Sequence, residues 1–247
     1  MKYLCLAYEE EDLFKAMPHE QWLALRQEAV IDPELRIVDA HHHFYDRPGW
    51  TYLADDYLAD ARSGHRVVAT VYMQAQTRYR AGGTEALRPV GETEAVIAMT
   101  QASSTEGPML AKGIVGHANL RLGAAVSEVL EAHIHAGQGR FKGVRHLSTW
   151  DADASLVNPL SAVPAGLLLD PMYQQGAAQL AKHQLSYDAW LFFHQLPELV
   201  ALAKSNNNTD VDSYFKPLIT ETTARISELQ KTLDSEITSE KGNALLT

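Results

Sequence analysis

Segments with strand character alternate with helical segments between Arg36 and Lys204. The segment 67–73 is rich in β-branched residues, which is typical of a buried strand. Regular alternation of this kind favours a parallel sheet or a β/α barrel over an antiparallel fold. We count about five β/α units, with strands expected at 36–40, 67–73, 111–116, 141–145 and 185–192 and helices at 92–102, 124–136, 172–182 and from 197.

The length of the chain limits how much of a barrel it can form. The 247 residues are 46% hydrophobic, which is enough for one sizeable core. The 43 residues after Lys204 read as linker and helix. They cannot hold three more strand–helix pairs, because a βαβ unit takes about 30 residues. The residues alone favour an α/β fold, either a parallel sheet or part of a β/α barrel, followed by a long C-terminal helix. The family resemblance described below implies the second, a partial (β/α)₈ TIM-type barrel.

Three regions are expected along the chain. Residues 1–30 form an N-terminal extension of strand and helix, 31–204 form the partial barrel, and 205–247 form a polar linker and an amphipathic helix. Apolar residues between Ile219 and Leu233 recur at spacings of three and four, a heptad-like stripe. The stripe could cover the open side of the barrel or pair two chains as a homodimer.

Charge and cysteine content exclude several function classes. The formal net charge is −10 with no basic run, so a nucleic-acid partner is not expected. The single cysteine, Cys5, rules out an internal disulfide and a cysteine-based zinc site. No apolar run reaches the roughly 20 residues needed to cross a bilayer. Residues 1–7 are too short for a signal peptide. We expect a cytoplasmic protein with no membrane partner.

The most informative residues for function are Asp39, His41, His42 and His43, which follow an apolar segment. Alternate side chains on a strand share a face, so His41 and His43 should project together with Asp39 below them. Two neutral imidazoles side by side can bind a divalent metal, which lowers the pKa of a bound water. Without a metal, the pair could still polarise a substrate carbonyl. Surface or core histidines are the structural alternative.

Other strand ends also carry polar residues, and active sites of such folds lie at the carboxyl ends of the strands. Arg145 could anchor a substrate carboxylate through a forked contact, or form an ion pair at the rim. Glu92 and Glu94 open a helix, where carboxylates favour a capping role. The remaining candidates at strand ends are Gln74, Gln76, His117, His146 and His194.

Several of these stretches together resemble one family. The run Val38-Asp39-Ala40-His41-His42-His43-Phe44-Tyr45-Asp46 is similar to the first-strand motif of the amidohydrolase-related hydrolases, in the branch that includes the 2-pyrone-4,6-dicarboxylate lactonases. The resemblance covers roughly residues 22–204. Further stretches fit in order at 63–72, 79–83, 85–94, 113–120, 139–146 and 195–199.

The resemblance implies a (β/α)₈ barrel that hydrolyses small lactones or related carbonyl compounds. The substrate would be a lactone or carboxylate. Some members use a divalent metal and others do not, so zinc, manganese or no cofactor are all open. By the same resemblance, His41, His43 and His194 would be catalytic, with His41 and His43 as metal ligands. Substrate would be bound by Gln74, Gln76, Tyr79, Arg145 and His146.

The sequence also departs from the family pattern. Phe193 stands where relatives often have a histidine, and the family's sixth-strand histidine and eighth-strand aspartate have no counterpart. Residues 1–20 weakly resemble the opening of small YCII-related domains, which suggests a composite gene. Two hypotheses follow: an amidohydrolase-related hydrolase, or a catalytically inactive truncated or composite remnant of one.

Overall fold

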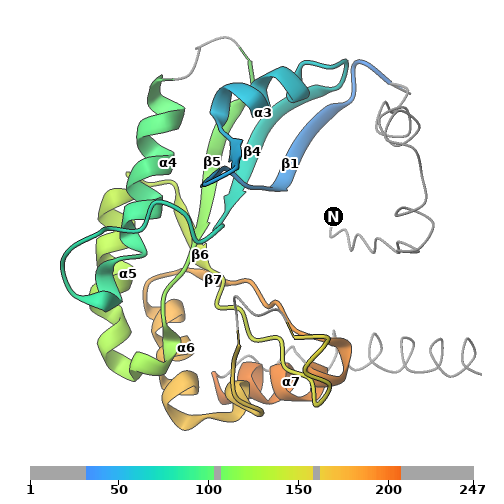
Figure 1. Ribbon diagram of the computed structural model, residues 1–247. Helices are drawn as coiled ribbons and strands as arrows, with labels where there is room; N and C mark the ends of the chain where they lie inside the picture. The colour runs from blue at the N-terminus through green and yellow to red at the C-terminus, as the bar shows by residue number, and fades with distance from the viewer. Residues whose placement is uncertain (1–31, 103–106, 158–161, 207–247) are drawn as a thin grey trace, which may run out of the picture.

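The centre of the molecule is a curled sheet of five parallel strands (Figure 1). The computed structural model describes residues 32–102, 107–157 and 162–206. The sheet order follows the chain order, so each strand pairs with the next one along the sequence. The predicted α/β class with a parallel sheet is confirmed. The strands are β1 (Arg36–His42), β4 (Arg66–Met73), β5 (Met109–Gly116), β6 (Phe141–Val144) and β7 (Ser186–Tyr187).

Four of the helices lie where the periodicity predicted them. They are α4 (Val90–Ala102), α5 (Val126–Ala136), α6 (Pro171–Lys182) and α7 (Leu196–Ser205). Helix α6 begins with Pro171, and the Asp170 carboxylate accepts hydrogen bonds from the N–H groups of Met172 and Tyr173. Short 3₁₀ segments precede or interrupt the loops at Glu85–Leu87 (η1), Leu120–Ala125 (η2), Leu167–Leu169 (η4) and Phe193–Gln195 (η5).

The segment between β1 and β4 holds structure that the sequence patterns did not reveal. A short antiparallel hairpin, β2 (Tyr45–Arg47) with β3 (Trp50–Tyr52), is followed by helix α3 (Ala54–Ala61). The indole of Trp50 stacks on the Tyr45 ring, with centroids 4.0 Å apart. These elements are too short for a clear hydrophobic period.

The prediction of a long fifth strand over 185–192 was wrong. Strand β7 is only two residues long, and a single parallel bridge joins Leu147 to Trp190 beyond it. Both the backbone N–H and the hydroxyl of Ser148 donate to the Trp190 carbonyl. The apolar run after Tyr187 has high β-propensity, but apart from the bridge at Trp190 it lies at the rim of the sheet outside any strand.

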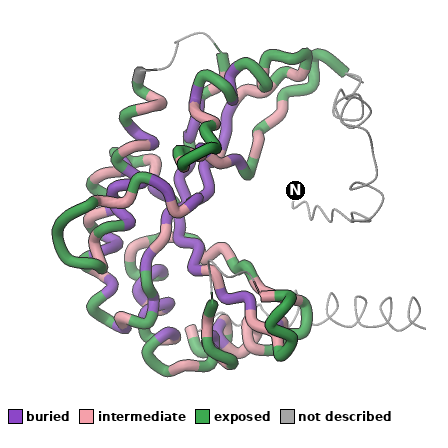
Figure 2. The backbone as a smooth tube through the Cα atoms, in the orientation of Figure 1, coloured by how far each residue is buried: buried purple, intermediate pink, exposed green. Residues whose placement is uncertain are grey.

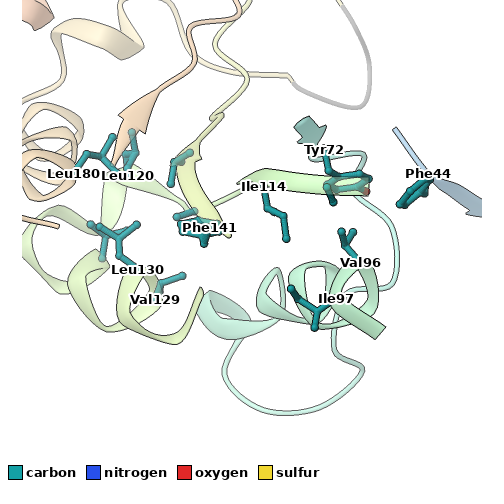
Figure 3. Packing of buried hydrophobic residues seen from close by; sticks show 14 of the residues in the cluster. Phe44, Tyr72, Val96, Ile97, Ile114, Leu120, Val129, Leu130, Phe141 and Leu180 are labelled. Carbon is teal, nitrogen blue, oxygen red and sulfur yellow. The ribbon is translucent and has the colours of Figure 1, made fainter. Parts of the chain in front are cut away.

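The hydrophobic core lies between the sheet and the helices. Ile114 on β5 and Phe141 on β6 face Val96 and Ile97 of α4 and Leu130 of α5 (Figure 3). Most residues of β5 and β6 and of the carboxyl half of β4 are buried (Figure 2), whereas β1 consists of exposed and half-buried residues until the buried His42. Strand β1 is an edge strand of the described sheet. Near its carboxyl end, His41 is exposed to solvent.

Several sequence-based predictions fall outside the described residues. These are the N-terminal extension, Cys5, the YCII-like start, the stripe between Ile219 and Leu233 and the long C-terminal helix. The homodimer therefore stays a prediction. None of the helices within the described ranges combines the length and apolar character needed to cross a bilayer.

Gly91 provides a test of how the loop after β4 packs on α4. A Cβ at Gly91 would lie 2.6 Å from the backbone nitrogen of Arg80 and 2.7 Å from the carbonyl oxygen of Arg78. We expect Gly91→Ala to lower the free energy of unfolding by about 1–3 kcal/mol, measured by urea denaturation, because backbone atoms must move. A Cβ at Gly82 in the same loop meets nothing within 4 Å, so Gly82→Ala is the control. Equal stability of the two variants would contradict this packing.

Candidate active site at the carboxyl ends of the strands

His41 and His43 lie side by side at the end of β1. Their Nε2 atoms are 3.1 Å apart and their ring centroids 4.9 Å apart. The Nδ1 atom of His43 lies 2.9 Å from the Met73 carbonyl oxygen, which can only accept a hydrogen bond. Nδ1 of His43 therefore carries the proton in the neutral ring, and its Nε2 lone pair faces His41. Both rings project to one side, as strand alternation predicted.

Asp39 does not lie below this pair, contrary to the expectation from strict alternation. The β1–β4 register shifts between Asp39 and His42. The Asp39 carboxylate accepts a 2.6 Å hydrogen bond from the Tyr57 hydroxyl of α3. The His42 ring also packs against Tyr57, with centroids 4.5 Å apart, so Asp39 and His42 both contact α3. A register irregularity of this kind reverses which side chains share a face.

Arg145 follows β6, and its guanidinium lies beside the ring of His41. It is 4% exposed, and its Nη1 lies 3.4 Å from His41 Nε2. Its other terminal nitrogen donates to the Gln74 carbonyl, and the guanidinium lies 4.6 Å from the Trp190 ring centroid. Its Nε has no hydrogen-bond partner. Among the described residues no carboxylate lies within ion-pair distance, so the rim ion pair predicted as an alternative is not formed there.

The electrostatics of the site keep both imidazoles neutral. Burial lowers the pKa of His43 to about 4, and the nearby Arg145 charge acts in the same direction. Partial burial and the charge of Arg145 also lower the pKa of His41. Neutral imidazoles retain the lone pairs needed to accept a proton or bind a metal.

Asp188 completes the charge balance, and the sequence reasoning missed it. Burial raises the pKa of its carboxyl group, while the hydrogen bond from the Ser186 hydroxyl and the charge of Arg145 oppose that rise. Asp188 directly follows β7, so it stands at a strand end. Because the strand was predicted to continue to residue 192, its predicted carboxyl end pointed to His194 and not to Asp188. Trp190, which packs under Arg145, was missed for the same reason.

A cavity of about 160 Å³ lies over this cluster. His43, Gln74, Gln76 and Arg145 line it, together with the indoles of Trp50 and Trp190. Gln76 has a left-handed backbone (φ 54°), which is uncommon for a residue with a side chain and tends to occur at functional sites. The structure thus brings His43, Gln74, Gln76 and Arg145 together as predicted, with His41 in contact with His43.

The other predicted site residues lie elsewhere. Tyr79 and His146 line a separate, larger cavity of about 570 Å³. Arg145 and His146 are consecutive at the end of β6, so their side chains leave opposite faces. His194 lies against the loop after β6, with Nε2 3.1 Å from the Trp150 carbonyl oxygen and Nδ1 3.7 Å from the Asp151 carboxylate. It lines neither cavity, and its catalytic role stays a prediction.

The histidine pair fits only part of a metal site. The Nδ1 bond from His43 to a carbonyl is typical of histidines that bind metals through Nε2. A catalytic zinc, however, takes three protein ligands. No group of three or more His, Cys, Asp or Glu side chains placed to hold an ion occurs in the described ranges. The buried Arg145 charge beside His41 also opposes a dication.

Glu92 has a different role from the helix cap that its position suggested. It is 2% exposed, and its Oε1 accepts hydrogen bonds from the N–H groups of Ala75 (2.6 Å) and Thr77 (3.4 Å) and from the Tyr72 hydroxyl (2.9 Å). The two N–H groups flank Gln76. Glu92 therefore holds the strained loop that presents Gln76 to the cavity. Glu94 forms an ion pair with Arg80.

Comparison with known proteins gives limited similarity. No family model matches the sequence. Uncharacterized protein y4mH of Sinorhizobium fredii is 26% identical over 194 residues, which is 71% of this chain and 58% of that protein. Two crystal structures of an amidohydrolase from Burkholderia multivorans, one with bound zinc and one with bound HEPES, are 22% and 21% identical, with TM-scores of 0.47 and 0.44. Each match covers 69% of this chain and 54% of the amidohydrolase. The chain thus spans little more than half the length of these relatives.

The burial of Glu92 predicts a pH dependence of stability. Burial raises its pKa from 4.5 to about 7. The folded chain therefore binds this proton more tightly than the unfolded chain, so the contribution to stability is full below pH 4.5 and is lost as the pH rises through 7. The difference is about 3 kcal/mol. We expect Glu92→Gln, which keeps the accepting oxygen, to remove this slope in urea denaturation from pH 4.5 to 8. An unchanged slope would show that Glu92 is already ionised.

Proposed function

We propose that this chain is a hydrolase of small carbonyl compounds, lactones or their relatives, that carry a carboxylate. The observation that carries the proposal is Arg145: a buried guanidinium with no carboxylate at ion-pair distance in the described residues, beside two neutral imidazoles. A buried charge without a partner is costly unless a ligand supplies one. Arg145 and His43 line the same cavity, and His41 lies beside it, with its Nε2 3.1 Å from His43 Nε2.

The arginine would fix the substrate. Its planar guanidinium can bind a carboxylate through two charge-assisted hydrogen bonds. The bond to the Gln74 carbonyl and the face of Trp190 hold the guanidinium plane in place. Gln76 lines the same cavity and could contact the carbonyl or ring oxygen of the substrate.

The histidine pair would move the proton. His43 is held by Met73, whereas His41 has no such ring contact to a carbonyl and can use either nitrogen. We propose that His41 takes a proton from water as the water oxygen bonds to the substrate carbonyl carbon. The C–O bond of the lactone then breaks, and the leaving oxygen takes the proton back from His41. A metal held by His41 and His43 would lower the pKa of the attacking water, but its further ligands are not among the described residues.

A specific observation favours the alternative, an inactive remnant. The described residues supply two of the three protein ligands of a catalytic zinc site, with a positive charge next to one of them. If the ancestral reaction required a metal, this chain would bind acids without turning them over. The experiments below separate the two candidates.

His41→Ala tests the proton-transfer role. With a panel of small lactones that carry a carboxylate, we expect kcat/KM to fall by about 10²-fold or more, because a positioned base contributes 10²–10⁴. His135→Ala is the matched control, since His135 is exposed on α5. Turnover by the wild type that survives in His41→Ala would contradict the mechanism. The absence of turnover in the wild type, with retained acid binding, would favour the remnant.

Arg145→Gln tests the anchoring role separately from the chemistry. We expect KM for an acid-bearing lactone to rise at least about tenfold, because a charge-assisted contact contributes 1.5–3 kcal/mol. The methyl ester of the same lactone lacks the charge, so its smaller dependence on Arg145 is the internal control. Arg36→Gln on the exposed part of β1 controls for net charge. An equal rise in KM for the acid and the ester would show that Arg145 does not bind the carboxylate.

A further inference from the structure

The larger cavity is separate from the histidine site. Its volume is about 570 Å³, and it shares no lining residue with the cavity of about 160 Å³. Its walls come from the segments after β4, β5 and β6 and from the loop before η4. It therefore stands at the carboxyl ends of the strands, where ligands of parallel α/β folds bind. Its size is within the range of small-molecule sites.

The charge of this cavity is positive. Arg88 and Arg121 line it, and neither forms an ion pair within the described part of the chain. Glu85 is the acidic residue among its described lining residues. Burial lowers the pKa of His146 to about 3 and also lowers that of His117, so both imidazoles are neutral. Two guanidinium groups against one carboxylate favour an anionic ligand.

The hydrogen-bonding groups of the wall are also defined. Nδ1 of His146 accepts from the Leu120 N–H (3.2 Å), so the neutral ring carries its proton on Nε2 and can donate there. Nδ1 of His117 lies 3.2 Å from the Arg145 carbonyl oxygen and must donate to it, which leaves its Nε2 as an acceptor. The buried Tyr79 hydroxyl has no partner. The arginines and His146 can donate hydrogen bonds to an anionic group, and His117 Nε2 can accept one from a hydroxyl. A ligand with both groups would match this wall.

We propose that this cavity is a second binding site, for a small organic anion that carries a hydroxyl group. The guanidinium groups of Arg88 and Arg121 hold the anionic group, and His146 donates to it. His117 accepts a hydrogen bond from the ligand hydroxyl, and the Tyr79 hydroxyl gains its missing partner. This site does not depend on the proposed hydrolase activity, because no residue of the histidine cavity takes part.

Calorimetric titration of the full chain tests the site with malate and succinate, two dicarboxylates that differ by one hydroxyl. We expect saturable binding of malate, at least about threefold tighter than succinate, because the hydroxyl adds one hydrogen bond. Arg88→Gln and Arg121→Gln should each weaken malate binding at least about tenfold. Arg36→Gln removes a charge outside the cavity and should leave the affinity unchanged. Arg145→Gln removes the acid contact of the histidine cavity and should also leave it unchanged, which places the ligand outside that cavity.

Three results would overturn the proposal. Malate binding that does not saturate below about 10 mM would show that no site exists. Binding that is lost in Arg145→Gln but kept in both Arg88→Gln and Arg121→Gln would place the anion in the histidine cavity. Equal affinity for malate and succinate would remove the assigned role of His117. Circular dichroism of each variant confirms that a loss of binding is not a loss of fold.

Discussion

The described structure depends on a positive charge buried at the carboxyl edge of the sheet. Arg145 is 4% exposed, yet its contacts are a backbone carbonyl, an indole face and a neutral imidazole rather than a carboxylate. Burying a cation costs several kcal/mol without compensation. The charges of Asp188 and Glu92 act on it from a distance and favour its charged form. This arrangement joins the ends of β1, β4, β6 and β7.

Two cavities with different lining groups lie at this carboxyl edge of the sheet. Strand alternation sends Arg145 to the histidine cavity and His146 to the larger one. In the loop after β4, Gln76 lines the histidine cavity and Tyr79 lines the larger one. Glu92 holds that loop by accepting hydrogen bonds from the N–H groups on both sides of Gln76. Consecutive residues therefore serve different cavities. A chain with few β/α units can in this way present one site suited to proton transfer and another suited to holding an anion.

Most of the fold could be predicted from the sequence because its long strands and helices have recognisable residue patterns. The strands β4 and β5 are rich in apolar residues and the helices α5, α6 and α7 are amphipathic, whereas α4 carries almost no one-sided apolar pattern. The pairing of His41 with His43 follows from the two-residue repeat of a strand. The failures have local causes. A register shift moved Asp39 to the α3 side, and propensity alone extended β7 past Asp188. The partition of Arg145 and His146 between the two cavities follows from strand alternation, whereas the family motif, written as one run of letters, assigned both residues to one site.

The central proposal is that Arg145 and two neutral imidazoles form an acid-binding site. The most direct measurement is the ¹⁵N nuclear magnetic resonance of the histidine rings at pH 7 during a titration with acetate. The account predicts that His43 is neutral with its proton on Nδ1, that His41 is neutral, and that acetate shifts the signals of these two rings more than that of the exposed His135. Imidazolium signals for His41 or His43 at pH 7, or rings that do not respond to acetate, would contradict it.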